Sequence, residues 1–122
     1  MEHVRKMDIE LLIQQLYRVL RPGGLMSHKI DLKDHLGGGL NNLRFPDWFW
    51  ENEWVANSGF YTNRISVSNW EYLFNECGFK TVKLEKILWE SLPIEKSKIE
   101  PSYRKNNDQD LLCSGFYCLL KK

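Results

Sequence analysis

The amino-acid sequence predicts a single small α/β domain, and three patterns lead to that prediction. Apolar residues recur at helical spacing between residues 7 and 21, alternate with polar residues between 79 and 87, and run almost uninterrupted from 111 to 120. These patterns are typical of an amphipathic helix, a strand with one wet face and a strand covered on both faces. At 122 residues the chain has the length of one domain.

The first helix is expected at Met7–Arg21. Asp8 is placed to cap its first turn, with Met7 and Leu12 as a hydrophobic staple. Pro22-Gly23-Gly24 ends it. Its apolar residues form one broad stripe, which consists of Ile9, Leu12, Ile13, Leu16, Val19 and Leu20.

A short strand is expected at Leu25–Asp31, because this run starts apolar and is bounded by Gly24 and by polar residues. From residue 32 to about 66 the periodicity disappears, and glycine, asparagine and aromatic residues dominate. A structureless loop of this length is unusual in a compact domain. We therefore interpret the segment as an insertion or lid, with a short helix at Pro46–Ala56 folded over the core.

A second helix is expected at Ser68–Cys77, where Ser68 and Glu71 have the spacing of a capping box. The strand at Phe79–Ile87 should turn Val82 and Leu84 inward.

The segment Trp89–Asp110 is polar, contains two prolines and is interpreted as a connection. The almost continuously apolar run Leu111–Leu120 belongs in the middle of a sheet.

Composition excludes several classes of function. With 17 basic and 16 acidic residues, the net charge of +1 gives no electrostatic reason to expect nucleic acid or an anionic membrane as a partner. Cys77, Cys113 and Cys118 form no C-x-x-C pair, so neither a zinc site nor a redox dithiol is indicated. Three free thiols and a charged start that is unlike a signal peptide favour a cytoplasmic protein.

Residues Glu2–Gly24 closely resemble the stretch that follows the fourth sheet strand in class I S-adenosylmethionine-dependent methyltransferases. In that family, the counterpart of Glu2-His3-Val4 ends the loop of the fourth strand, and the counterpart of Leu16–Gly24 ends a helix and turns into the fifth strand. The resemblance implies the carboxyl-terminal half of a Rossmann-like domain. It would contain two main helices on a mixed three-stranded sheet, with the last strand antiparallel in the middle.

The activity that the resemblance implies is methyl transfer from S-adenosylmethionine to a small-molecule acceptor. In the family, a glycine-rich turn and an acidic ribose-binding residue lie in the half that would precede Met1. We therefore expect this chain alone to bind the cofactor weakly or not at all, and to be inactive. The alternative is a non-catalytic interaction module or relic subunit.

Two short segments could carry chemistry. Glu2 and His3 match the family's position next to cofactor and acceptor, and His3 could act as a general base. The alternative for His3 is a frayed terminal histidine without a partner. Asp31 and His35 follow the fifth-strand candidate and could polarise or deprotonate an acceptor. The alternative is turn chemistry, which is the favoured role of Asp34.

The aromatic residues of the insertion could form a substrate lid that stacks on adenine or on a planar acceptor. Such clusters are more often satellite core beneath a long loop. Gly37–Gly39 lacks both phosphate-binding glycine patterns and is interpreted as a hinge. The lid candidates are Trp48, Trp50, Trp54 and Tyr61.

Self-association is the last expectation. In the family, the fifth strand pairs with the fourth, so the strand at Leu25–Asp31 should have an unpaired edge in this chain. An open edge is a template for a second copy. We therefore expect a homodimer joined antiparallel through this strand, with the stripe of the first helix packed across the two-fold axis.

Overall fold

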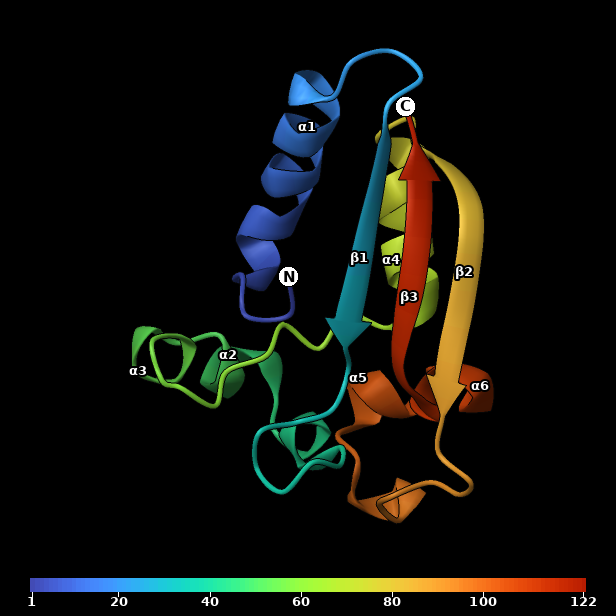
Figure 1. Ribbon diagram of the computed structural model, residues 1–122. Coiled ribbons are helices and arrows are strands. Elements are labelled where there is room, and N and C mark those ends of the chain that lie inside the picture. The colour runs from blue at the N-terminus through green and yellow to red at the C-terminus, as the bar shows by residue number, and fades with distance from the viewer.

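The computed structural model describes residues 1–122 as a three-stranded sheet with two helices against one face (Figure 1). Helix α1 spans Ile9–Val19 and helix α4 spans Val67–Glu76. The strands are β1, Leu25–Asp31, β2, Lys80–Leu88, and β3, Cys113–Lys121. The chain is therefore an α/β protein with an open sheet, as the sequence predicts. None of its helices combines the length and the apolar character needed to cross a membrane.

The sheet has the order β1-β3-β2, and β3 runs antiparallel to both neighbours. Cys118 of β3 lies opposite His28 of β1 and opposite Leu84 of β2. The prediction that the last strand is antiparallel and central is confirmed. A mixed sheet needs at least one parallel pair of strands. β1 and β2 run in the same direction but do not pair with each other, so both pairs in this sheet are antiparallel and the prediction of a mixed sheet is wrong.

Strand β1 has the predicted bounds, whereas β2 departs from simple alternation. Thr81 lies opposite Leu120, but Lys83 lies opposite Leu119, so Val82 is the extra residue of a β-bulge. A one-residue shift turns a side chain to the other face, and Val82 is 55% exposed. The expectation that Val82 points inward is therefore wrong, whereas Leu84 packs against the core as predicted.

Helix α1 starts differently from the prediction. A single 3-10 turn, Lys6–Asp8, leads into it, and the Asp8 side chain accepts no capping hydrogen bond. Met7 is 76% exposed, so it forms no staple with Leu12. The helix is held mainly by its buried face, where Ile9 and Ile13 are almost fully covered.

Helix α4 is capped two residues earlier than predicted. The Ser66 hydroxyl accepts the Asn69 backbone N–H at 3.3 Å. Ser68 lies inside the helix, and its hydroxyl donates to Asp110 at 2.7 Å. The capping box at Ser68 is therefore wrong, because a second serine at the right distance takes the cap.

One hydrophobic cluster, the main core, fills the space between the helices and the sheet. It takes side chains from every one of these five elements or their ends. Its buried members are Ile9, Ile13, Ile30, Ile65, Val67, Trp70, Phe74, Phe79, Cys113, Phe116, Cys118 and Leu120.

The insertion contains three single-turn helices rather than the one helix expected at Pro46–Ala56. A 3-10 turn covers Asn41–Arg44, α2 covers Asp47–Trp50 and α3 covers Glu53–Ala56. Asn52 separates α2 from α3 because its side chain caps α3, accepting the Val55 N–H at 3.0 Å. The insertion is not folded over the main core. It buries Trp50, Val55 and Tyr61 in a small cluster of its own, the insertion core.

The segment expected as a plain connection is also built around buried residues. It contains a 3-10 turn at Lys96–Lys98, helix α5 at Pro101–Arg104 and helix α6 at Asp108–Leu111. A third cluster joins it to the insertion. Its buried members are Leu40, Leu43, Ile99, Tyr103 and Leu111. Its apolar residues are too widely spaced along the chain to give a periodic pattern, so the sequence did not reveal this packing.

Candidate functional site

The four candidate residues of the amino-terminal turn and the β1 exit lie together. The rings of His3 and His35 meet edge to face, with centroids 4.8 Å apart. Glu2 and Asp31 line one cavity of about 30 Å³ at the carboxyl end of β1. Tertiary structure thus joins two segments that are about thirty residues apart in the sequence.

His3 has a fixed partner. Its Nδ1 lies 2.9 Å from the backbone oxygen of Tyr61. A carbonyl oxygen only accepts, so Nδ1 donates, and in the neutral ring Nε2 is then free of a proton. The interpretation of His3 as a frayed residue without a partner is therefore wrong, and its Nε2 is the atom able to accept a proton.

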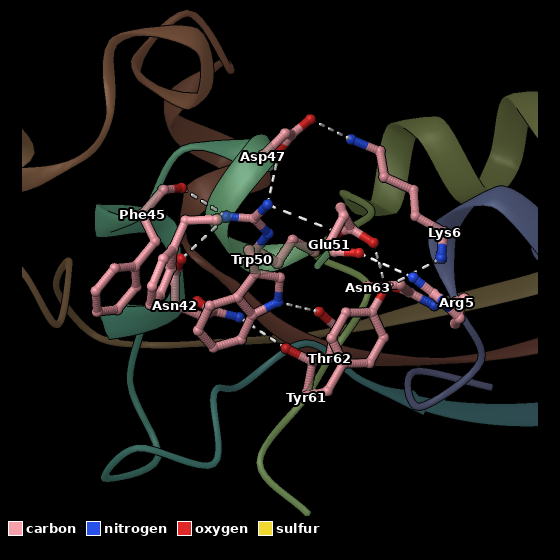
Figure 2. Close-up of polar contacts among 12 residues, drawn as sticks. Arg5, Lys6, Asn42, Phe45, Asp47, Trp50, Glu51, Tyr61, Thr62 and Asn63 are labelled. Carbon is pink, nitrogen blue, oxygen red and sulfur yellow. Dashed lines mark hydrogen bonds and ion pairs between the residues drawn. The ribbon is translucent and has the colours of Figure 1, made fainter. Parts of the chain in front are cut away.

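Asn63 holds the amino-terminal turn that carries His3. Its side-chain amide donates to the backbone oxygens of Met1 and Val4 at 3.1 and 3.2 Å. Its backbone N–H donates to the Glu2 oxygen at 2.8 Å. Asn63 is 1% exposed, so this anchor is inside the protein. Figure 2 draws Asn63 together with the polar cluster described below.

The two candidate carboxylates that line the cavity, Glu2 and Asp31, already have partners. Glu2 pairs with the terminal ammonium at 2.9 Å. Partial burial opposes ionisation of Glu2, but hydrogen bonds and the terminal charge outweigh it and lower the Glu2 pKa. The Asp31 carboxylate accepts the Lys33 N–H at 2.9 Å, and the Lys33 ammonium lies 3.6 Å away. Asp31 therefore shows the turn chemistry that was the alternative to a role on an acceptor.

Asp34 organises the glycine loop that follows β1. It is 2% exposed, and its carboxylate accepts the backbone N–H groups of Leu36 and Gly38 at 2.8 and 3.1 Å, and that of Asn41. Positive φ angles at Gly37 and Gly38 let the chain wrap around it. The three glycines are thus an ordered turn around a buried anion rather than a simple hinge.

The most connected residue of this region is Arg64, which the sequence analysis did not single out. Its side chain is fully covered and donates to Asp47 at 2.6 Å and to the backbone oxygens of Asn42 and Phe45 at 3.2 and 2.7 Å. The Glu51 carboxylate lies 3.6 Å away. Figure 2 shows these partners converging from the insertion. A buried guanidinium is stable only with such a set of acceptors.

Aromatic rings complete the Arg64 cluster. The guanidinium lies 4.8 Å from the Tyr103 ring centre and 5.2 Å from that of Trp50. The Tyr103 hydroxyl donates to Asp47 at 2.5 Å. Burial, followed by this hydrogen bond to a carboxylate, raises the Tyr103 pKa well above its usual range. Tyr103 therefore acts as a hydrogen-bond donor at neutral pH.

Tyr61 connects the Arg64 cluster to His3. Its backbone oxygen accepts a hydrogen bond from His3, and its hydroxyl donates to Glu51 at 2.8 Å and accepts the Lys6 N–H at 3.0 Å.

The backbone of Arg64 is strained. Arg64 is the only non-glycine residue with a positive φ, +58°. Such a conformation costs free energy and persists only where the surroundings enforce it. The only feature of the sequence that could have indicated the Arg64 cluster is a polar run, Thr62–Arg64, inside an aromatic-rich segment.

The four lid candidates separate into two pairs. Trp50 and Tyr61 are 1% and 2% exposed and belong to the insertion core. The Trp50 indole N–H donates to the Thr62 oxygen at 2.8 Å. Trp48 and Trp54 are 79% and 75% exposed. The buried pair therefore matches the satellite-core alternative, and only the exposed pair offers rings to a ligand.

No model of a known protein family matches this chain, and no curated protein sequence matches it. No group of three or more histidine, cysteine, aspartate or glutamate side chains is arranged to hold a metal ion.

Proposed function

We propose that residues 1–122 form the carboxyl-terminal half of a class I S-adenosylmethionine-dependent methyltransferase domain that methylates a small-molecule acceptor. The observation that carries the proposal is the sheet order β1-β3-β2 with β3 antiparallel to both neighbours. It is the arrangement that the resemblance of Glu2–Gly24 implies for the last strands of the domain.

The cavity beside the candidate residues is too small for the cofactor. The cavity beside Glu2 and Asp31 holds about 30 Å³, whereas sites for ligands of cofactor size are roughly 300–1,000 Å³. The chain also contains no glycine-rich turn of the dinucleotide-binding type. We therefore assign cofactor binding to an amino-terminal half of the domain and derive no methyl-transfer step from these residues.

Within this proposal His3 is the general base. Its Nε2 carries no proton in the neutral ring, and His3 is exposed, so an acceptor hydroxyl or amine can reach it. His35 packs against the His3 ring and limits its orientation. Asp31 lines the adjoining cavity.

Calorimetric titration with S-adenosylmethionine and S-adenosylhomocysteine tests the proposal. The 122-residue chain should give no binding heat, because the residues that surround the cofactor are not in it. A version extended at its amino terminus by the encoded upstream residues should bind both compounds. A low-micromolar dissociation constant for the 122-residue chain, or no binding by the extended chain, would contradict the proposal.

A second candidate is a self-associating, non-catalytic module, and the free edge of β1 favours it. At the two ends of the β1–β3 ladder, Leu32 N–H donates to the Ser114 oxygen and Lys122 N–H donates to the Gly24 oxygen, each at 3.0 Å. Alternate residues of an antiparallel strand bond the same neighbour. The backbone N–H and C=O groups of the even-numbered residues of β1 therefore point toward β3. Those of the odd-numbered residues point to the open edge and are free.

This alternation identifies the variant that tests a homodimer through β1. Met26 bonds β3, so Met26→Pro would damage the fold itself, whereas Ser27→Pro removes a donor from the free edge. The stripe of α1 offers less surface than expected, since Ile9 is buried, although Val19 is 67% exposed. Light scattering should show a dimer that Ser27→Pro weakens. A folded monomer at high protein concentration would rule out this candidate.

A further inference from the structure

A second and larger pocket lies between the amino-terminal ends of α1 and α4. Its volume is about 500 Å³, which is within the range of small-molecule sites. The walls come from Met7 and Glu10 on the α1 side and from Tyr72 on α4, and Asn106 closes the pocket beyond α5. We call it the α1–α4 pocket.

The cationic groups of the α1–α4 pocket are already paired. Arg64 donates to Asp47 at 2.6 Å, and the Lys6 ammonium lies 3.2 Å from the same carboxylate. The Tyr103 ring of the pocket is engaged too, because Arg64 and Lys6 both lie over it, at 4.8 and 5.7 Å from its centre. An anionic ligand would therefore have to displace Asp47 from its cations, which disfavours anions.

The groups of the pocket that have no partner are an acidic side chain and two exposed side chains beside it. The Glu10 carboxylate makes no hydrogen bond and no ion pair with the protein, and it is the one charged side chain of the lining without a partner. Beside it, the Met7 and Tyr72 side chains are 76% and 61% exposed. A free carboxylate next to uncovered apolar surface is complementary to an ammonium group on an apolar body.

We propose that the α1–α4 pocket binds a small organic cation, an amine whose ammonium pairs with Glu10 and whose apolar part packs on Met7 and Tyr72. This inference goes beyond the proposed function and does not depend on it, because the site lies wholly within the 122 residues. The amine-binding proposal can therefore be refuted while the methyltransferase proposal stands, and the methyltransferase proposal can be refuted while the amine-binding proposal stands.

The test uses the 122-residue chain and two probes of the same shape, 2-phenylethylamine and the uncharged 2-phenylethanol. Backbone amide shifts in NMR titrations give both affinity and location. The amine should bind with a dissociation constant of about 1 mM or better. Its shifts should concentrate on the start of α1 and on α4. The alcohol should bind at least about fivefold more weakly, since it lacks the charge.

Glu10→Gln removes the charge but keeps the size of the side chain, and it should weaken amine binding about three- to tenfold, because the site is partly open to solvent. Glu90→Gln is the matched control, since Glu90 is exposed and outside the pocket. Equal binding of amine and alcohol, equal effects of the two substitutions, or amine shifts located elsewhere would each overturn the proposal.

Discussion

The main core and the Arg64 cluster are stabilised in opposite ways. The main core is a continuous apolar cluster in which Trp70, Phe74 and Phe116 have no exposed surface. The Arg64 cluster is centred on a buried charge and holds the insertion through polar contacts. Apolar burial is non-directional and tolerates small shifts, whereas a buried ion pair requires every partner in place. A substitution that unfolds one region should therefore leave the other region folded.

The largest expected effect is in the main core. Trp70→Ala should lower the free energy of unfolding by about 3–5 kcal/mol, because the site is fully buried and a cavity remains. Trp48→Ala, at a position 79% exposed, should change it by less than about 0.5 kcal/mol. Denaturant unfolding measures both. Similar losses for the two would mean that Trp48 is covered in solution, by a second copy or by other parts of the protein.

A smaller and local effect is expected in the Arg64 cluster. Arg64→Leu should cost roughly 2–3 kcal/mol, less than a fully buried pair would, because Asp47 is half exposed. Hydrogen exchange should accelerate in residues 41–64 and remain slow in β3. Arg44→Leu is the control, since Arg44 is exposed and makes no ion pair. Equal acceleration across the sheet would show that the two regions unfold as one.

Neighbouring residues at the β1 exit separate structure from chemistry. Asp34→Ala removes the acceptor of three backbone N–H groups and should cost about 1–3 kcal/mol. His35→Ala should change thermal stability little, because His35 is exposed. Comparable decreases in melting temperature would make His35 a structural residue and remove it from the candidate site.

The smallest effect is a pH dependence of the Arg64 cluster. Burial opposes ionisation of Asp47, but the Tyr103 hydrogen bond and the charges of Lys6 and Arg64 lower its pKa below the ordinary 3.8. A lowered pKa gives stability that is present above the ordinary value and lost as pH falls through the folded one. The stability difference between the wild type and Asp47→Asn should therefore shrink below about pH 4. A difference constant from pH 7 to pH 3 would contradict this.

Sequence reasoning succeeded where the signal is periodic and local. The sequence predicts the strand Leu25–Asp31 with its observed bounds, and apolar patterns predict the two long helices, α1 and α4, and the central position of β3. It failed where a single residue changes the local geometry. The bulge at Val82 reversed a side chain, and the cap at Ser66 replaced the one expected at Ser68.

The candidate site divides in the same way. His3 could be named from the family resemblance and His35 from its position after the expected strand, but nothing in the sequence indicated that their rings touch. The partner of His3 is a backbone oxygen of Tyr61, and any residue type can supply such an acceptor.

The sequence by itself determined which elements form and which of their faces are apolar, because helical and strand periodicities are written in consecutive residues. Only the tertiary structure decided that Arg64, Asn63 and Asn42 are buried, since polar residues are exposed by default and become buried only when distant partners satisfy them. Those partners come from the amino-terminal turn, the insertion and α5. Their meeting depends on long-range packing that no local pattern encodes.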